Sequence, residues 1–399
     1  MGRVTAIGER EYRHRRTALL EQVQPGEGAG MLWWGNHRIF YLTGFAFVPT
    51  ERPIALVLDR DGRTALFVPR LEVEHAQAYA HVDRVEAYPE FPDVEHPMTY
   101  LCRLLRDMGV DGKVLGDGEG YPRIMGYWGP TLTEVAEVPF EACDELLERM
   151  MQRKSEAEVE LVRESARWAA RAHRLLQEYT RPGSSETEVE MRAAFEANRE
   201  LLAEYGDAYR AHSWGASGPH AGYRGQIGAH SAMPHSLNRN AVFSAGDTLV
   251  TGASCPMFGY FSELERTMFL GEPSSEQERY FHHMLVLQDL AIEACRAGRS
   301  CSSVDRAVRE YCQEHGLEPH WRHHTGHNIG IRYHEGPFLD VGDETVMQPG
   351  MLFTVEPGLY VEGLGGFRHS DTILVTEGDP EFLTDYPRDL RSLVLPAAR

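Results

Sequence analysis

The sequence lacks the features that mark membrane-spanning and secreted proteins. None of its 399 residues lie in an uninterrupted apolar run of about 18, the length that a membrane span requires. The opening segment, MGRVTAIGEREYRHRR, has no apolar stretch behind its basic residues, so we expect no signal peptide. The six cysteines are scattered without C-x-x-C or zinc-finger spacing and are expected to be reduced thiols. These absences predict a cytoplasmic protein.

Basic residues are also scarce. The chain has 40 Lys and Arg against 60 Asp and Glu, which gives a formal net charge of −20. Phosphate backbones and anionic lipid surfaces would repel such a molecule, so neither nucleic acid nor a membrane is an expected partner. The apolar share of 42% is ordinary for a chain that folds around sizeable cores, and the length favours two or three domains.

The first part of the chain alternates between helical and strand patterns. TALLEQVQ and MTYLCRLLRDMG are typical of helices, whereas GMLWWG, PIALVLD and TALFVP are short strand-like runs. This alternation predicts an α/β domain. A long amphipathic stretch, LERMMQRKSEAEVELVRESARWAARAHRLLQEY, then marks a change of character, and we place a domain boundary just before Ser155.

The second part of the chain follows the order helices, strands, helices, strands. Amphipathic segments are followed by the strand-like runs NAVFSAGDTLVTGAS and GYFSELERTMFLG. Helical patterns return at about 275–297 and 303–315, and the strand-like GMLFTVEPGLYV and FRHSDTILVT come last. An internally duplicated α+β domain would give this order.

Several polar residues stand in apolar, strand-like surroundings. A buried charge without a partner destabilises the folded state by roughly several kcal/mol. We therefore expect these residues either to have polar partners or to have a function. They are His235, Glu263, Glu265, His327, His334, Glu335 and Glu356. Together they predict a functional site, with Glu335 in a structural role.

Six motifs follow one another from Arg153 to the end of the chain: RKSEAEVELVRESA, the Gly246–Asp247 pair, GHNIG, HEGP, EPGLY and GGFRHSDTILVT. In this order they resemble the creatinase/aminopeptidase P/prolidase family, and the resemblance covers nearly the whole chain. It implies an α/β amino-terminal domain, residues 1–154, followed by an α+β pita-bread catalytic domain, residues 155–399. It also implies a homodimer.

Peptidases of that family bind two metal ions through two Asp, one His and two Glu. The resemblance carries these positions onto Gly252, Glu263, His327, Glu356 and Ser370. Glycine offers no side-chain donor and a serine hydroxyl is a poor ligand, so we expect a metal-free site without a cofactor. Two alternatives stay open: a hydrogen-bonded core pair of His327 and Glu356, and a single weakly bound metal on Glu263, His327 and Glu356.

Creatinases are metal-free hydrolases of the same family, and GASCPMFGYFSELERT resembles their corresponding segment. The resemblance implies that His235 is the acid/base group and that Glu265 and Glu356 hold a cationic carbon–nitrogen centre. A guanidinium or amidinium already carries positive charge on the carbon to be attacked, so carboxylates and one histidine suffice. Attack by water and attack by Glu265 with a covalent intermediate both remain possible.

The resemblance also suggests substrate contacts. It implies that Arg52 reaches the substrate carboxylate across a dimer and that His327 and His334 contact the substrate. Aromatic rings suit a flat cation, which adds Trp214 and Tyr260 as candidates. In length, motifs and acidity the chain resembles the bacterial ectoine hydrolases. We therefore expect a metal-independent hydrolase that opens the cyclic amidine ring of ectoine to N-acetyl-2,4-diaminobutyrate.

Three alternatives have different consequences. A creatinase-like enzyme would act on another guanidine or amidine. A pita-bread metallopeptidase or lyase would use a degenerate metal site. A binding module without catalysis would have no need of His235, Glu265 and Glu356 at creatinase-like positions.

Overall fold

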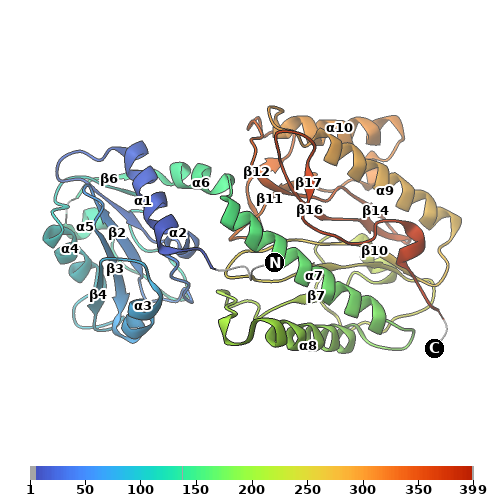
Figure 1. Ribbon diagram of the computed structural model, residues 1–399, viewed down its shortest axis with the longest axis horizontal. Helices are drawn as coiled ribbons and strands as arrows, with labels where there is room; N and C mark the ends of the chain where they lie inside the picture. Colours follow the sequence, from blue (N-terminus) through green and yellow to red (C-terminus); the bar gives the residue numbers. More distant parts are fainter. Residues whose placement is uncertain (1–5, 137, 398–399) are drawn as a thin grey trace. The chain divides into compact units, whose positions relative to one another are not determined.

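The computed structural model describes residues 6–136 and 138–397. The chain divides into two compact units, one within Thr5–Met151 and one within Gln152–Arg399. Figure 1 draws the first from blue to green-blue and the second from green to red. In the described residues, every helix is too short or too polar to cross a lipid bilayer.

The amino-terminal unit is a mixed sheet with helices. Its strands are β1 (Gly30–Trp33), β2 (Ala55–Asp59), β3 (Thr64–Pro69), β4 (Arg84–Tyr88), β5 (Val114–Gly116) and β6 (Phe140–Ala142). Its helices are α1 (Glu9–Val23), α2 (Asn36–Thr43), α3 (Val73–Tyr79), α4 (Pro97–Asp107), α5 (Leu132–Ala136) and α6 (Asp144–Gln152).

These six strands form one sheet in the order β4-β3-β2-β1-β5-β6. The pairs β3–β4, β1–β5 and β5–β6 are parallel, and the pairs β1–β2 and β2–β3 are antiparallel. Every residue of β1, β2 and β3 is buried, which explains why their sequences are nearly continuous apolar runs rather than alternating ones. The predicted α/β character of this part is confirmed.

The long amphipathic stretch is two helices. Helix α6 ends at Gln152, and α7 (Glu156–Tyr179) begins after Ser155. The Ser155 hydroxyl accepts a hydrogen bond from the Glu158 amide, and the Glu158 carboxylate accepts one from the Ser155 amide at 2.8 Å. This reciprocal capping fixes the start of α7, because it satisfies two amide donors that the helix leaves open.

The carboxyl-terminal unit begins with α7, which is followed by three more helices and by short strands. Its other helices are α8 (Glu186–Tyr205), α9 (Ser275–Ala294) and α10 (Cys301–Glu314). Its strands are β7 (His220–Gly222), β8 (Thr248–Val250), β9 (Gly252–Ser254), β10 (Thr267–Leu270), β11 (Gly326–Asn328), β12 (Glu335–Leu339), β13 (Leu352–Val355), β14 (Gly358–Val361), β15 (Gly365–Arg368), β16 (Asp371–Leu374), β17 (Glu381–Phe382) and β18 (Val394–Leu395).

The predicted order of helices, strands, helices and strands is confirmed in this unit. Helices α7 and α8 lie side by side, as do α9 and α10 (Figure 1). The larger sheet has the order β12-β11-β13-β16-β17, and β8 and β10 form a second sheet with β18. One apolar core joins the helices to both sheets.

The strand pairings bring distant parts of the sequence together. Strand β11 is paired with β12 on one side and β13 on the other, and β13 is paired with β16. A separate bridge joins Glu265 to Ser370, with hydrogen bonds of 3.0 Å in both directions. Backbone pairing therefore places the GHNIG, EPGLY, LERT and FRHSD motifs around one region.

Candidate metal centre

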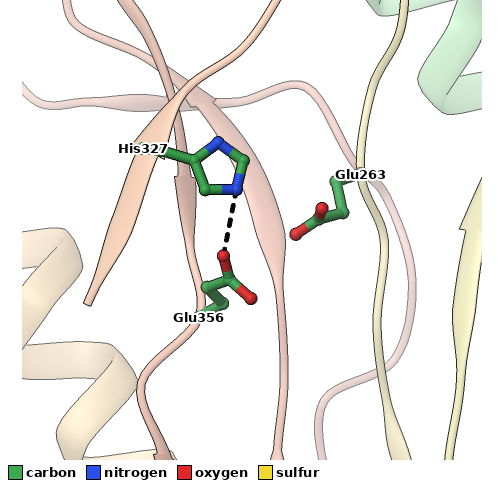
Figure 2. A group of neighbouring side chains, drawn as sticks. All are labelled: Glu263, His327 and Glu356. Carbon is green, nitrogen blue, oxygen red and sulfur yellow. Dashed lines mark ion pairs between the residues drawn. The ribbon is translucent and has the colours of Figure 1, made fainter. Parts of the chain in front are cut away.

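Three of the residues singled out in the sequence converge on one point. Ligand atoms of Glu263, His327 and Glu356 all lie within 4.8 Å of one another. His327 belongs to β11, Glu356 follows β13, and Glu263 comes from the segment between β9 and β10 (Figure 2). His327 Nε2 lies 3.1 Å from Glu356 Oε1. Two carboxylates and an imidazole at this spacing can hold one divalent transition-metal ion.

Neighbouring groups orient these three side chains. His327 Nδ1 lies 3.0 Å from the carbonyl oxygen of Asn328, and donation to that oxygen directs Nε2 toward the two carboxylates. The Ser370 hydroxyl donates to Glu263 Oε1 at 2.7 Å. Metal ligands are commonly held by such outer bonds, which fix ring and carboxylate orientation.

The electrostatics of the group favour a cation. Burial, together with the charges of Glu356 and Glu265, raises the pKa of Glu263 to about 8. Burial opposes protonation of His327, but its bond to Glu356 and the nearby carboxylates raise its pKa to about 9. Burial acts to raise the pKa of Glu356, yet His327 and Arg368 hold it well below its usual range. Glu263 and His327 therefore each hold a proton at neutral pH, and a metal ion that binds here would displace these protons.

The two remaining positions of the family's ligand set do not supply carboxylates. Gly252 has no side chain, and the Ser370 hydroxyl already donates to Glu263. The donor set therefore fits one ion and lacks the bridging oxygens of a pair. Loss of two positions is compatible with metal binding, because the three ligands that remain still meet.

Glu265 is held by two arginines beside this group. Its Oε1 accepts hydrogen bonds from Arg368 Nη2 at 2.8 Å and from Arg224 Nη2 at 2.6 Å, and Arg368 Nε contacts Oε2. Burial disfavours the charge of Arg368, but Glu265 and the surrounding acidic groups raise its pKa well above the usual value. With both oxygens engaged by guanidinium groups, Glu265 is a weak nucleophile.

A second histidine adjoins the metal ligands. The ring of His334 stacks on that of His327, with centroids 3.9 Å apart and planes inclined by 19°. Burial and the charge of His327 lower the pKa of His334 to about 4. His334 is consequently a neutral imidazole at pH 7, able to accept or donate a hydrogen bond toward the cavity.

Glu263, Glu265 and His334 line a cavity of about 780 Å³ within the carboxyl-terminal unit. A volume of this size suits a small ligand. The polar and aromatic groups in its wall include Glu190, Arg224, Glu263, Glu265, Tyr333 and His334.

His235 and Trp214 lie near the cavity but are exposed. His235 follows the short helical turn Gly228–Ala232, and its charge contributes to the lowered pKa of His334. Trp214 is 67% exposed, and its chain neighbours Ser213 and Gly215 line the cavity. The acid/base role of His235 and the stacking role of Trp214 stay predictions.

Tyr260 and Arg52 are engaged in other bonds. Tyr260 is buried, and its hydroxyl donates to Glu158 Oε1 at 2.8 Å. Arg52 belongs to the amino-terminal unit, where its Nε donates to Glu90 Oε1 at 2.6 Å. Substrate contacts by Tyr260 and Arg52 stay predictions.

Arg224 and Arg368 were not among the predicted site residues. Arg368 stands two residues before Ser370 in the FRHSD motif, which is a usable signal. Arg224, in GYRGQIG, has no comparable signal, because its place depends on a backbone conformation with φ of +51°.

Comparisons with known proteins agree with this architecture. Residues 160–377 match the family model described as metallopeptidase family M24, and residues 15–120 match that of the creatinase/prolidase N-terminal domain. A probable dipeptidase, PepE, of Mycobacterium tuberculosis is 30% identical over 388 residues, which covers 96% of this chain and 97% of the relative.

Solved structures give the same result. Dipeptidase PepE from Mycobacterium ulcerans aligns with a TM-score of 0.80 at 26% identity and covers 98% of this chain and 100% of its own. An Xaa-Pro dipeptidase from Bacillus anthracis, at 24% identity, also has a TM-score of 0.80, with 97% and 100% coverage, and supports the fold. The predicted pita-bread architecture with an α/β amino-terminal domain is confirmed.

The predicted opening of the ectoine ring is wrong. The matched relative is named a probable dipeptidase and the matched family is described as metallopeptidase family M24, and neither description agrees with hydrolysis of a cyclic amidine. The expectation of a metal-independent enzyme also loses its basis. That expectation was based on the absence of carboxylates at Gly252 and Ser370. A single ion can be held by the donors of Glu263, His327 and Glu356 alone.

Proposed function

Because the chain belongs to metallopeptidase family M24, we propose that it is a hydrolase of short peptides that works with one bound divalent metal ion. The convergence of Glu263, His327 and Glu356 within 4.8 Å, with Glu263 in the wall of a cavity, carries this proposal. The names of the relatives support the choice of dipeptides as substrates.

Glu263, His327 and Glu356 would hold the ion. Their mixture of oxygen and imidazole nitrogen donors suits manganese, iron, cobalt or zinc. When bound, such an ion polarises a peptide carbonyl and makes a bound water more acidic. Ser370 and the Asn328 carbonyl would keep the ligands aligned through the bonds that they make to Glu263 and His327.

Other residues of the chain would handle protons and charge. His334, a neutral imidazole against His327, would accept a proton from the attacking water and return it to the leaving amine. Arg368, paired with Glu265, would limit the negative charge around Glu356, whose Oε2 is 4.0 Å from Arg368 Nε.

The cavity volume of about 780 Å³ supports a small peptide rather than a folded protein as the substrate. We include in the proposal the homodimer implied by the family resemblance and a cytoplasmic location. Light scattering of the purified protein tests the dimer, since a single species of the monomer mass would exclude it.

The experiment is a hydrolysis assay with alanyl-leucine, glycyl-proline and a pentapeptide. We expect cleavage of at least one dipeptide, loss of turnover with a chelator, and recovery when Mn²⁺, Co²⁺ or Zn²⁺ is added back. Glu263→Gln should abolish that recovery, whereas Glu188→Gln, on the exposed part of α8, should retain it. Turnover that is unaffected by prolonged chelation would overturn the proposal.

A further inference from the structure

Arg224 has an unusual position in the cavity. It follows β7, with a φ of +51°, in a backbone conformation that costs a non-glycine residue about 1 kcal/mol or more. Its side chain is 48% exposed and lies in the cavity wall. Among the described residues of that wall, Arg224 is the one arginine or lysine.

The space beside Gly252 accommodates this guanidinium. Gly252 in β9 pairs with Gly222 in β7, two residues before Arg224. A Cβ atom added at Gly252 would lie 3.7 Å from Arg224 Nη2 and 3.4 Å from Glu265 Oε1. The family resemblance places a metal-binding aspartate at position 252. In this chain the Arg224 guanidinium lies close to where the side chain of that aspartate would extend.

Arg224 shares its carboxylate partner, Glu265, with a second arginine. Both Arg224 and Arg368 donate to Glu265 Oε1, so one carboxylate serves two guanidinium groups. Nη2 of Arg224 makes its bonds to Glu265 and, at 3.4 Å, to Gln226. For Nε and Nη1 of Arg224, no partner is found among residues 6–136 and 138–397. These donors are available to a ligand.

We propose that Arg224 binds the C-terminal carboxylate of the substrate and thereby restricts this enzyme to peptides that end one residue beyond the scissile bond. A guanidinium binds a carboxylate through directed, charge-assisted hydrogen bonds. One residue spans about 3.8 Å, so a dipeptide's carboxylate lies close to its peptide carbonyl. Arg224 lies close to the proposed metal ligands, because Glu265 is a neighbour of both Arg224 and Glu263.

This inference rests on the proposed function but is tested without turnover. The probes are alanyl-leucine with its peptide bond reduced to CH₂–NH, which cannot be hydrolysed, and the C-terminal amide of the same compound. Calorimetric titration of the full-length protein, as purified, gives the affinity for each probe. We expect the acid to bind at least about tenfold more tightly than the amide, as for loss of a charge-assisted hydrogen bond.

Arg224→Gln should bind the two probes equally, and Arg224→Lys should recover part of the preference for the acid. Both variants should fold, because Arg368 still neutralises Glu265. Arg192→Gln is the matched control: this arginine of α8 is exposed and pairs with Glu196. It should keep the wild-type ratio of affinities.

Retention of the acid preference in Arg224→Gln would overturn the inference, as would a wild-type protein that binds both probes equally or binds neither. The proposed function fails separately. A protein that prefers the acid through Arg224 but cleaves no dipeptide would contradict the peptidase assignment and leave carboxylate binding by Arg224 in place.

Discussion

Ser370 donates a hydrogen bond to Glu263, with 2.7 Å between Oγ and Oε1. The two residues are far apart in the sequence, and the bridge between Glu265 and Ser370 brings them together. At a position where the family's peptidases have a glutamate ligand, this chain has a residue that orients another ligand. The donors that remain, Glu263, His327 and Glu356, fit one ion.

Ser370→Ala tests this orienting role. Without the hydroxyl, Glu263 loses the bond that fixes its carboxylate, and we expect metal affinity to fall about 10- to 100-fold. Competition with a fluorescent chelator measures the change. Ser302→Ala, a buried serine in α10, is the control and should retain wild-type affinity. Equal affinity in wild type and Ser370→Ala would contradict the role.

Gly252→Asp restores a carboxylate at one of the two missing positions. The new side chain would start 3.7 Å from Arg224 Nη2, so we expect an ion pair with Arg224 rather than a second metal site. The number of ions bound at saturation, measured by equilibrium dialysis and elemental analysis, should stay at one. A second ion in this variant would show that Arg224 does not compete for the aspartate.

Lys154 and Glu335 form a buried ion pair behind the site. Their Nζ and Oε2 atoms are 2.8 Å apart, their side chains are 1% and 2% exposed, and Lys154 also contacts Asn328. Lys154→Met leaves a buried carboxylate without its cation, which should lower the free energy of unfolding by about 3–5 kcal/mol. Urea denaturation measures this loss.

The exposed pair of Arg171 and Glu200 is the matched control for that experiment. Arg171→Met should change the free energy of unfolding by less than about 1 kcal/mol, because solvent already screens the pair. Similar losses in the two variants would refute the distinction between the buried and the exposed pair.

His173 gives the protein a stability that depends on pH. This histidine of α7 is fully buried, its Nε2 lies 2.6 Å from Thr251 Oγ1, and burial and the charge of Arg266 lower its pKa to about 3. Between pH 6.5 and 3 the unfolded chain binds a proton at this site and the folded chain does not. Stability is therefore lost as the pH falls through that window, by up to about 1.4 kcal/mol per pH unit.

His173→Gln should reduce the number of protons taken up on unfolding by about one between about pH 6 and 4.5. The pH dependence of the free energy of unfolding, measured by urea denaturation at several pH values, gives this number. The amide of glutamine can reach toward Thr251 in place of Nε2, so the fold should persist. His282→Gln, on an exposed part of α9, should leave the slope unchanged. An unaltered slope in His173→Gln would exclude this origin of the pH dependence.

Periodicity in the sequence was sufficient to predict the α/β first part and the helix–strand order of the second. The strands β2 and β3 are continuous apolar runs, and α7 begins at a capping serine, so local signals define these elements. Motif resemblance also named Glu263, His327 and Glu356, which the structure brings together.

The composition of the site around those ligands could not be predicted in the same way. The position of Arg224 against Glu265 depends on a positive φ and on space left by a glycine in a paired strand, neither of which leaves a pattern in one segment. Counting missing ligands at Gly252 and Ser370 led to a metal-free site, because sequence alone does not show that the other three side chains still converge.

The most direct test of the account is the number of metal ions per chain. The protein is dialysed against Mn²⁺ or Zn²⁺ and analysed by mass spectrometry of its elements, beside Glu263→Gln, His327→Gln and Glu356→Gln. The account predicts one ion per chain in the wild type and a large loss of binding in each variant. No bound ion in the wild type, or two ions that persist in these variants, would contradict it.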